Sequence, residues 1–302
     1  MALKQQGNNS VEELVEKITR LVEDQRVYEV AKVVLSIEPH DLVDILDRLE
    51  DQIRRRIIPA IPLDHIAPVI TRLSDEALYE IVISRGVSEL ARVLVDVPPD
   101  DVADVLQRLP PRIRNQILNL LPPWKSEEVL KLLRYPPESA GGVMTPRIPV
   151  FNSRERIEKV LEKYIAKFQL GLYDKHNYVY VVDDEQKLVG WVDVKSLLIA
   201  PRDKPLGDVA VKPPAIVRAE ADREEAARLV VKYDLLEIPV VDAEGRLLGA
   251  ITIDDLLDVM VAELTEDLLK FGGYIETIRG RYLGARVVEL VRKRAPWLLV
   301  LY

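Results

Sequence analysis

The chain has 302 residues, of which 48% are hydrophobic and 30% charged, a composition typical of a globular protein. Its net charge of −8 argues against a nucleic-acid-binding surface and makes cations the natural partners. The sequence contains no cysteine, which excludes disulfides and zinc-thiolate sites, and its three histidines lie in unrelated contexts that do not indicate a metal site.

The first ten residues, MALKQQGNNS, lack the apolar core of a signal peptide. No stretch of about 20 apolar residues occurs anywhere in the sequence, so we expect the chain not to span a membrane.

Residues 11–135 are predicted to be helical throughout. Apolar residues recur at helical spacing in VEELVEKITRLVE and HDLVDILDRL. Because proline is compatible with a helix start but not with a helix interior, the prolines divide the segment into short helices joined by turns. These prolines are Pro39, Pro59, Pro62, Pro98, Pro99, Pro110, Pro111, Pro122 and Pro123.

The helical segment also contains an internal repeat. PHDLVDILDRL begins at Pro39 and PPDDVADVLQRL carries its matching proline at Pro99, 60 residues later. At the same offset, the segment from residue 57 to 73 resembles the segment from 117 to 133. Repeated helices that bury each other's faces predict a small superhelical stack.

From about residue 136 the pattern changes to strands alternating with helices. The β-rich runs at 178–184 and 237–243 are each followed by a turn and a second short strand, with Gly190 and Gly249 in register. Upstream of each lie an extended piece and a charged amphipathic helix. The sequence therefore predicts a tandem repeat of about 60 residues, ordered strand, helix, strand, turn, strand, helix.

The second repeat runs into an acidic helical segment, residues 251–271. Asp254, Asp255 and Asp258 fall on one face of this helix, whereas three further acids form a cluster on roughly the opposite face, namely Glu263, Glu266 and Asp267. Like charges at this spacing destabilise an isolated helix. A plain solvated face is the alternative to a cation-binding role.

The last residues of the sequence contain a basic stretch, followed by Trp297 and by an apolar run up to Tyr302. This order is typical of a cytoplasmic segment that enters a membrane helix, with a buried C-terminal helix end as the alternative.

The tandem repeat resembles a pair of CBS domains, most clearly in LLEIPVVDAEGRLLGAITIDDLLDV and VMTPRIPVF. With the helical repeat before it and TEDLLKFGG after it, nearly the whole chain resembles the cytoplasmic region of MgtE-type magnesium channels. The implied fold class is multidomain: an all-α superhelical repeat domain, an α/β tandem CBS pair and a C-terminal connecting helix. The helical domain corresponds to residues 1–135, the two CBS copies to 136–200 and 201–262, and the connecting helix with the start of a membrane segment to 263–302.

The resemblance implies that Mg²⁺ binds between acidic surfaces and holds a closed state. Mg²⁺ prefers oxygen ligands and often retains several waters, which suits clustered carboxylates. The matching acids, any of which is otherwise a solvated surface group or a helix cap, are Asp100, Asp101, Asp104, Asp222, Glu224, Glu225, Asp234, Asp255, Asp258, Glu266 and Asp267. The backbone carbonyl of Gly142 is a further candidate ligand, whereas Pro68 stands where the family often has another acid.

The family also implies a homodimer through the CBS pair, on the cytoplasmic side of a membrane pore domain that this sequence lacks. Either the chain is part of a longer protein or the gene encodes a separate sensor. The alternative function is a soluble CBS regulator that senses an adenosine nucleotide. The usual Ser/Thr-x-x-Asp nucleotide motif fits Thr252 to Asp255 but not Asp193 to Ser196 in the first copy. No nucleophile–base pair or phosphate loop indicates an enzyme.

Overall fold

The computed structural model describes residues 2–174, 176–257, 259–261 and 264. They form two compact units. The first contains residues up to 97 together with 105–126, and the second contains residues 98–104 together with those from 127 onward. Helix α8 (Pro99–Arg108) begins in the second unit and ends in the first. In the described part of the chain, no helix combines the length and apolarity needed to cross a membrane.

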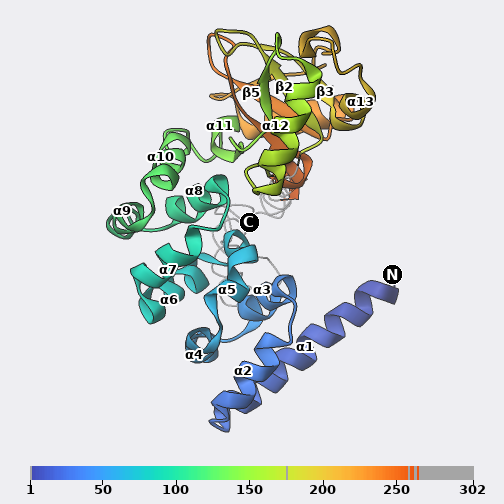
Figure 1. The fold of residues 1–302 in the computed structure, drawn as a ribbon. Helices are drawn as coiled ribbons and strands as arrows, with labels where there is room; N and C mark the ends of the chain where they lie inside the picture. The colour runs from blue at the N-terminus through green and yellow to red at the C-terminus, as the bar shows by residue number, and fades with distance from the viewer. Residues whose placement is uncertain (1, 175, 258, 262–263, 265–302) are drawn as a thin grey trace, which may run out of the picture. The chain divides into compact units, whose positions relative to one another are not determined.

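The first unit is built from short helices, as the proline spacing predicts (Figure 1). The longest is α1 (Ala2–Glu23), which packs against α2 and α3. The other elements are α2 (Val27–Leu35), α3 (Pro39–Arg48), α4 (Asp51–Ile57), η1 (Ile58–Ala60), α5 (Leu63–Ile66), η2 (Ala67–Arg72), α6 (Asp75–Arg85), α7 (Val87–Leu94), the later part of α8, α9 (Pro111–Leu120) and the beginning of α10 (Pro123–Leu132).

The predicted repeat is confirmed at the two helices whose sequences match best. Further along the chain, the two copies differ in structure. Helices α3 and α8 both have 10 residues, and both begin at the proline that the sequence comparison aligned. The segment equivalent to α10 is broken into α5 and the 3₁₀ helix η2, with Pro68 near the start of η2. A proline there removes a helical hydrogen bond and clashes with the preceding turn, which explains why the second copy alone forms one continuous helix.

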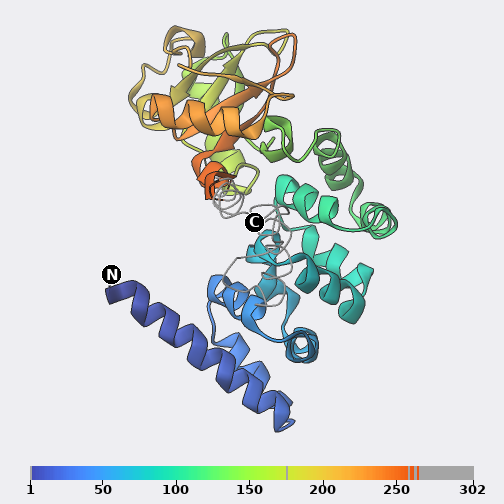
Figure 2. The same ribbon diagram turned by 180° about the vertical axis from the view of Figure 1, so that it is seen from behind.

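The second unit contains the predicted tandem repeat. Its elements are α11 (Ala140–Val143), β1 (Val150–Asn152), α12 (Ile157–Gln169), β2 (Tyr178–Val182), β3 (Leu188–Asp193), α13 (Val194–Ile199), η3 (Leu206–Asp208), β4 (Val217–Arg218), α14 (Arg223–Tyr233), β5 (Glu237–Val241) and β6 (Leu247–Thr252). They form two three-stranded sheets, ordered β1-β2-β3 and β4-β5-β6. Helix α12 lies in front in Figure 1 and α14 in front in the reverse view of Figure 2.

The two sheets share one register. Val181 pairs with Gly190 in the first sheet as Val240 pairs with Gly249 in the second. A side chain on Gly249 would place its Cβ 2.4 Å from the carbonyl oxygen of Thr145, so only glycine allows this approach. Thr145 thereby adds to β6 through two backbone hydrogen bonds with Ala250, which connects the segment before β1 to the second sheet.

Candidate functional site

Three of the predicted acids lie on α8, and one of them is poorly solvated. Asp100 is the second residue of the helix, so it is not the N-cap residue that its sequence position also allowed. Asp100 as a whole is partly exposed, but its Oδ1 atom is buried and has no hydrogen-bond partner among the described residues. Asp101 and Asp104 are partly exposed on the same helix.

The carboxyl group of Asp100 lies in a negative environment. Its pKa is raised well above the ordinary value, first by burial and then by the charges of Asp174, Asp101 and Asp255. All four aspartates belong to the second unit. We refer to Asp100, Asp101, Asp174 and Asp255 as the acidic group. Such a group lowers its energy by taking up a proton or a cation.

Asp255 belongs to the helical segment that follows β6. Its Oδ2 accepts a hydrogen bond of 2.5 Å from the Thr252 hydroxyl at the end of the strand. Asp234 lies toward the same end of this sheet, because Ile253 donates a backbone hydrogen bond of 3.0 Å to the carbonyl of Leu236. Asp234 ends α14 in a left-handed conformation, with φ of 52°, and its side chain is exposed.

Asp174 was not among the residues predicted from the sequence. It lies in the loop between α12 and β2, and its side chain is 21% exposed. Its Oδ2 accepts a hydrogen bond from the Thr145 hydroxyl, and its Oδ1 lies 4.0 Å from a guanidinium nitrogen of Arg147. No sequence motif marks this loop, so only the fold brings Asp174 to the acidic group.

The predicted acids at the start of α14 are separate from the acidic group. Asp222 caps the helix by accepting a hydrogen bond of 2.8 Å from the Glu224 backbone, which confirms a capping role. Gly142 lies nearby in α11, since the adjacent Ser139 pairs with Asp222. An 11-residue helix separates Asp222 from Asp234 by about 17 Å, so the two cannot bind one ion.

Three predicted ligands, Asp258, Glu266 and Asp267, lie outside the described residues, as does the predicted connecting helix. Among the residues that are described, no three acidic or histidine side chains are spaced to hold a metal ion directly. The acidic group offers only oxygen donors, including one buried oxygen without a partner. These donors fit a hard cation that keeps part of its water shell, as Mg²⁺ does.

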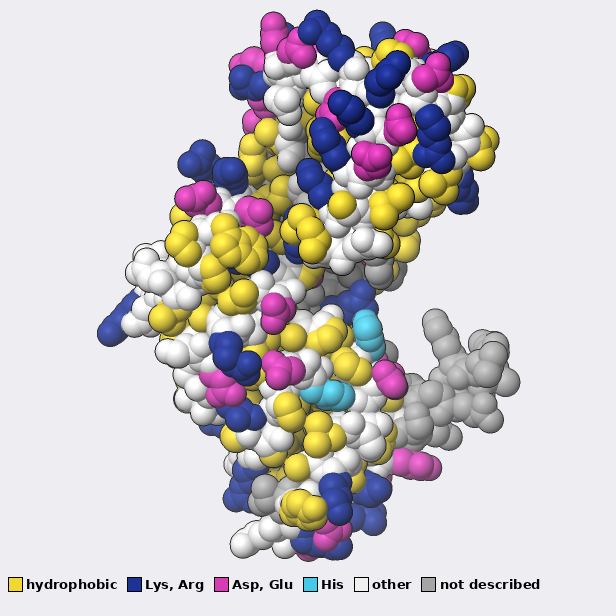
Figure 3. Space-filling view, in the orientation of Figure 1, with side chains coloured by type: hydrophobic (Ala, Val, Ile, Leu, Met, Phe, Trp, Pro, Cys, Tyr) yellow, Lys and Arg dark blue, Asp and Glu magenta, His cyan; other side chains and the backbone are white. Residues whose placement is uncertain are grey.

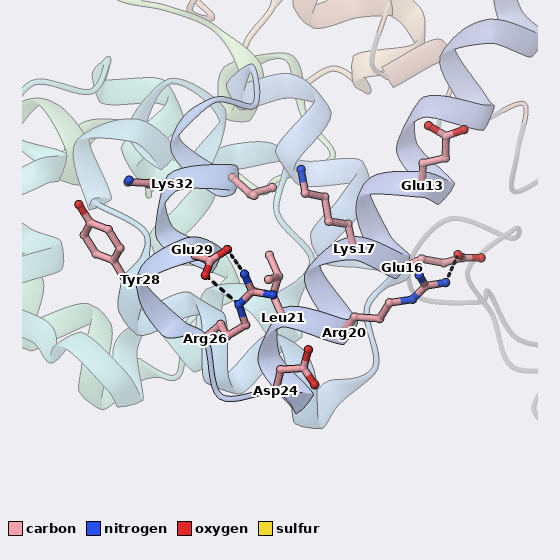
Figure 4. Close-up of a pocket in the computed structure, with 11 residues that line it drawn as sticks. Glu13, Glu16, Lys17, Arg20, Leu21, Asp24, Arg26, Tyr28, Glu29 and Lys32 are labelled. Carbon is pink, nitrogen blue, oxygen red and sulfur yellow. Dashed lines mark hydrogen bonds and ion pairs between the residues drawn. The ribbon is translucent and has the colours of Figure 1, made fainter.

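Charge on the surface does not by itself identify this site. On the face of the second unit that is visible in Figure 3, acidic and basic side chains are interspersed. A groove between α1 and α2 is likewise rich in acids, but two of them are paired with arginines (Figure 4). Arg20 pairs with Glu16 at 3.3 Å and Arg26 pairs with Glu29 at 2.6 Å, so we do not assign this groove to a cation.

At the first-copy position that departs from the nucleotide motif, the structure has a local helix cap. The Asp193 carboxylate accepts hydrogen bonds from the backbone of Lys195 and Ser196 at the start of α13. At the equivalent place in the second copy, Thr252 and Asp255 form the hydroxyl–carboxylate pair described above. Only the second copy therefore presents the Thr-x-x-Asp arrangement.

Comparison with known proteins identifies both parts of the chain. Residues 12–138 match the MgtE intracellular N domain, and residues 140–203 and 206–262 match CBS domains. The chain is 32% identical over 275 residues to the magnesium transporter MgtE of Thermus thermophilus, covering 89% of this chain and 60% of the transporter. It is 28% identical over 294 residues to MgtE of Bacillus subtilis, covering 97% and 64%.

A solved structure extends this similarity to the fold. The cytosolic domain of the Mg²⁺ channel MgtE, crystallised in complex with ATP, is 30% identical with a TM-score of 0.69. The match covers 81% of this chain and 99% of the crystallised one. The chain spans about three fifths of the length of the two transporters it matches.

Proposed function

This chain belongs to the family of MgtE cytosolic domains, and we propose that it senses cytosolic Mg²⁺ and thereby gates a magnesium pore. The two matched transporters are named for magnesium, which supports Mg²⁺ as the ion. In this proposal the chain itself carries no catalytic activity, and the pore is supplied by a membrane domain.

The observation that carries the proposal is the buried, unpartnered Oδ1 of Asp100. A buried carboxylate oxygen without a donor costs free energy, and the nearby charges of Asp174 and Asp255 add to that cost. A divalent cation removes both penalties at once, because it supplies positive charge and polarises the water molecules that donate to the oxygens.

Cation binding at this place would bear on the connection between the two units. Two unit charges about 4 Å apart repel by roughly 1 kcal/mol at the dielectric constant of water, and by more where water is excluded. Without a cation, the start of α8 and the end of β6 repel each other through Asp100 and Asp255. Bound Mg²⁺ reverses that interaction and stabilises one arrangement. Helix α8, which carries Asp100, continues from the second unit into the first.

We propose that this arrangement is the closed state of the pore. Bound Mg²⁺ holds it when the cytosolic concentration is high, and loss of Mg²⁺ releases it. The acids at the start of α14, together with Gly142, Asp104 and Asp234, extend the cation-binding surface in the same proposal. So do Asp258, Glu266 and Asp267.

A homodimer is the second part of the proposal. Two exposed apolar side chains lie on one face of the helical segment after β6: Ile253 and Leu257 are 37% and 51% exposed. One turn of a helix brings these two positions within about 40° of one another. A second copy of the CBS pair would cover this stripe.

Nucleotide sensing is the alternative function, and the Thr252–Asp255 pair favours it. A hydroxyl and a carboxylate three residues apart suit the two hydroxyls of a ribose. The related cytosolic domain was crystallised with ATP, which supports adenosine nucleotides as the ligand class. Because Asp255 also belongs to the acidic group, nucleotide and cation would interact at this residue.

Small-angle scattering tests the sensing function on the full chain. We expect the radius of gyration to fall when chelator is replaced by about 10 mM Mg²⁺, a concentration suited to weak carboxylate sites. Sodium chloride at equal ionic strength controls for screening, which also weakens repulsion. The scattering mass reports the dimer in the same samples.

Each arm of this experiment has a distinct outcome. Compaction by Mg²⁺ but not by sodium chloride supports the magnesium sensor. Equal compaction by both salts contradicts it, because the response is then general screening. Compaction by ATP in chelator, with no response to Mg²⁺, favours the nucleotide regulator instead.

A further inference from the structure

The loop that carries Asp174 is attached to the segment before β1 by reciprocal contacts. The backbone N–H of Asp174 donates to the carbonyl of Arg147 at 3.0 Å, and the Arg147 guanidinium donates to the carbonyl of Gly171 at 2.8 Å. The Thr145 hydroxyl donates to the Asp174 carboxylate. Residues 145–147 and 171–174 therefore hold each other in place, and Asp174 has little freedom to turn away.

The same segment brings Asp174 to the end of the second sheet. Thr145 pairs with Ala250 of β6, with backbone hydrogen bonds of 2.9 Å and 3.1 Å. Asp255 follows five residues later, just beyond the end of that strand. Thr145 thus contacts both copies: its hydroxyl binds Asp174 of the first, and its backbone pairs with Ala250 of the second. The charge of Asp174 also acts on Asp100 of α8.

The two oxygens of Asp174 have different surroundings. Oδ2 is occupied by the Thr145 hydroxyl, whereas Oδ1 makes no hydrogen bond within the described part of the chain. The nearest cationic group to Oδ1 is the Arg147 guanidinium at 4.0 Å, beyond hydrogen-bond distance. Both side chains are 21% exposed, so water and ions reach the space between them.

We propose that Asp174 is a further cation-binding carboxylate of the acidic group, and that Arg147 is the resident positive charge with which a divalent cation competes. The inference rests on the proposed function and deepens it. It adds a carboxylate from the first CBS copy, and it adds Arg147 as a residue that sets the Mg²⁺ concentration needed for binding. Arg147 partly neutralises the group when metal is absent. A bound cation must therefore stabilise the carboxylates more than the guanidinium already does. This requirement keeps the affinity of the acidic group for Mg²⁺ low.

A purely structural role for Asp174 makes a different prediction. If the residue only anchors its loop through Thr145, a substitution changes thermal stability equally with and without Mg²⁺. Asp174→Asn is the informative change, because asparagine keeps the shape and can still accept the Thr145 hydrogen bond while the charge is removed. Asp203→Asn is the matched control, since it removes one exposed carboxylate from the loop after α13.

The experiment measures the melting temperature of the full chain across a Mg²⁺ titration at constant ionic strength. We expect Asp174→Asn to raise the apparent Kd for Mg²⁺ about tenfold, at the lower end of what loss of an outer-shell metal partner costs. Its melting temperature in chelator should not fall, because one repulsive charge is gone. Asp203→Asn should titrate like the wild type.

Arg147→Met is the second arm, and it works in the opposite direction. Methionine retains an apolar stem but removes the competing charge, so we expect a lower melting temperature in chelator and a lower apparent Kd for Mg²⁺. If this variant binds Mg²⁺ as the wild type does, Arg147 has no competing role. This arm also keeps the inference testable if Asp174→Asn fails to fold.

The two proposals fail in different ways. A wild-type chain whose melting temperature does not respond to Mg²⁺ overturns the sensing function. A wild-type chain that responds, with Asp174→Asn responding equally, overturns only the role of Asp174.

Discussion

The Oδ1 atom of Asp100 is buried away from water and has no hydrogen-bond partner among the described residues. Asp254 is a useful contrast, because it lies next to a member of the acidic group and is exposed to solvent. The ionised form of Asp100 is disfavoured by burial and by the neighbouring charges, whereas an exposed aspartate is stabilised by water. The difference between the two residues is therefore one of environment rather than of residue type.

The raised pKa of Asp100 predicts a pH dependence of stability in the metal-free chain. Because the folded pKa lies above the unfolded one, the stabilising contribution is present below the ordinary carboxyl pKa and is lost as pH rises through the folded value. At neutral pH the wild type should therefore be less stable than Asp100→Asn. Urea unfolding in chelator, from about pH 5 to pH 8, measures this difference.

We expect the difference between the two proteins to shrink as the pH is lowered, because the wild-type carboxyl group takes up its proton. Other acids titrate in both proteins and cancel in the comparison. A difference in unfolding free energy that stays constant with pH would show that Asp100 is an ordinarily solvated carboxylate.

Glu237, at the start of β5 in the second CBS copy, is hydrogen-bonded to the first copy. This side chain is fully buried, and its Oε2 accepts a hydrogen bond of 2.7 Å from the Tyr180 hydroxyl of β2. Its Oε1 accepts a hydrogen bond from the Asn177 backbone. Burial raises the pKa of Glu237, and these hydrogen bonds oppose that rise. The carboxylate thus connects the second sheet to the first.

Glu237→Ala should destabilise the chain, since it leaves the buried Tyr180 hydroxyl without an acceptor and removes the acceptor of the Asn177 N–H. A buried hydroxyl left without a partner costs about 1–3 kcal/mol. Glu244→Ala is the control, because Glu244 is an exposed carboxylate paired with Arg246 in the β5–β6 hairpin, and such surface changes stay within about 0.5 kcal/mol. Equal unfolding free energies for the two variants would show that Glu237 contributes no more than a surface acid.

Much of the element order could be predicted from local patterns. Prolines that begin α3, α8, α9 and α10 act within one turn, so their effect is visible in the sequence. The register of Gly190 and Gly249 followed from the alignment of the two copies. Pro68 was noted only as standing where the family often has an acid, and its interruption of the helix required the structure.

The candidate site was less predictable. The acids of α8 and Asp255 were assigned by family resemblance, and in the folded chain the charges of Asp101 and Asp255 both raise the pKa of Asp100. Asp174 could not be found in this way, because its position depends on the pairing of Thr145 with Ala250, more than 100 residues away in sequence. The domain boundaries and the cation-binding role of all the predicted acids remain predictions.

At the scale of the whole molecule, a net charge of −8 means that any cation acts on the chain to some degree. Mg²⁺ at about 10 mM contributes the same ionic strength as about 30 mM sodium chloride, and screening alone weakens long-range repulsion. A specific site differs from screening because its occupancy saturates as the Mg²⁺ concentration rises. With a Kd of about 1 mM, it stabilises the folded state by about 1.4 kcal/mol at about 10 mM Mg²⁺.

Calorimetric titration of the chain with Mg²⁺ at constant ionic strength tests the acidic group most directly. The proteins compared are the wild type, the double variant Asp100→Asn/Asp255→Asn, and the control Asp254→Asn. We predict saturable binding to the wild type and the control with the same affinity, and binding that is at least about tenfold weaker in the double variant. Binding of Mg²⁺ to the double variant with wild-type affinity would contradict the assignment of the cation to this group.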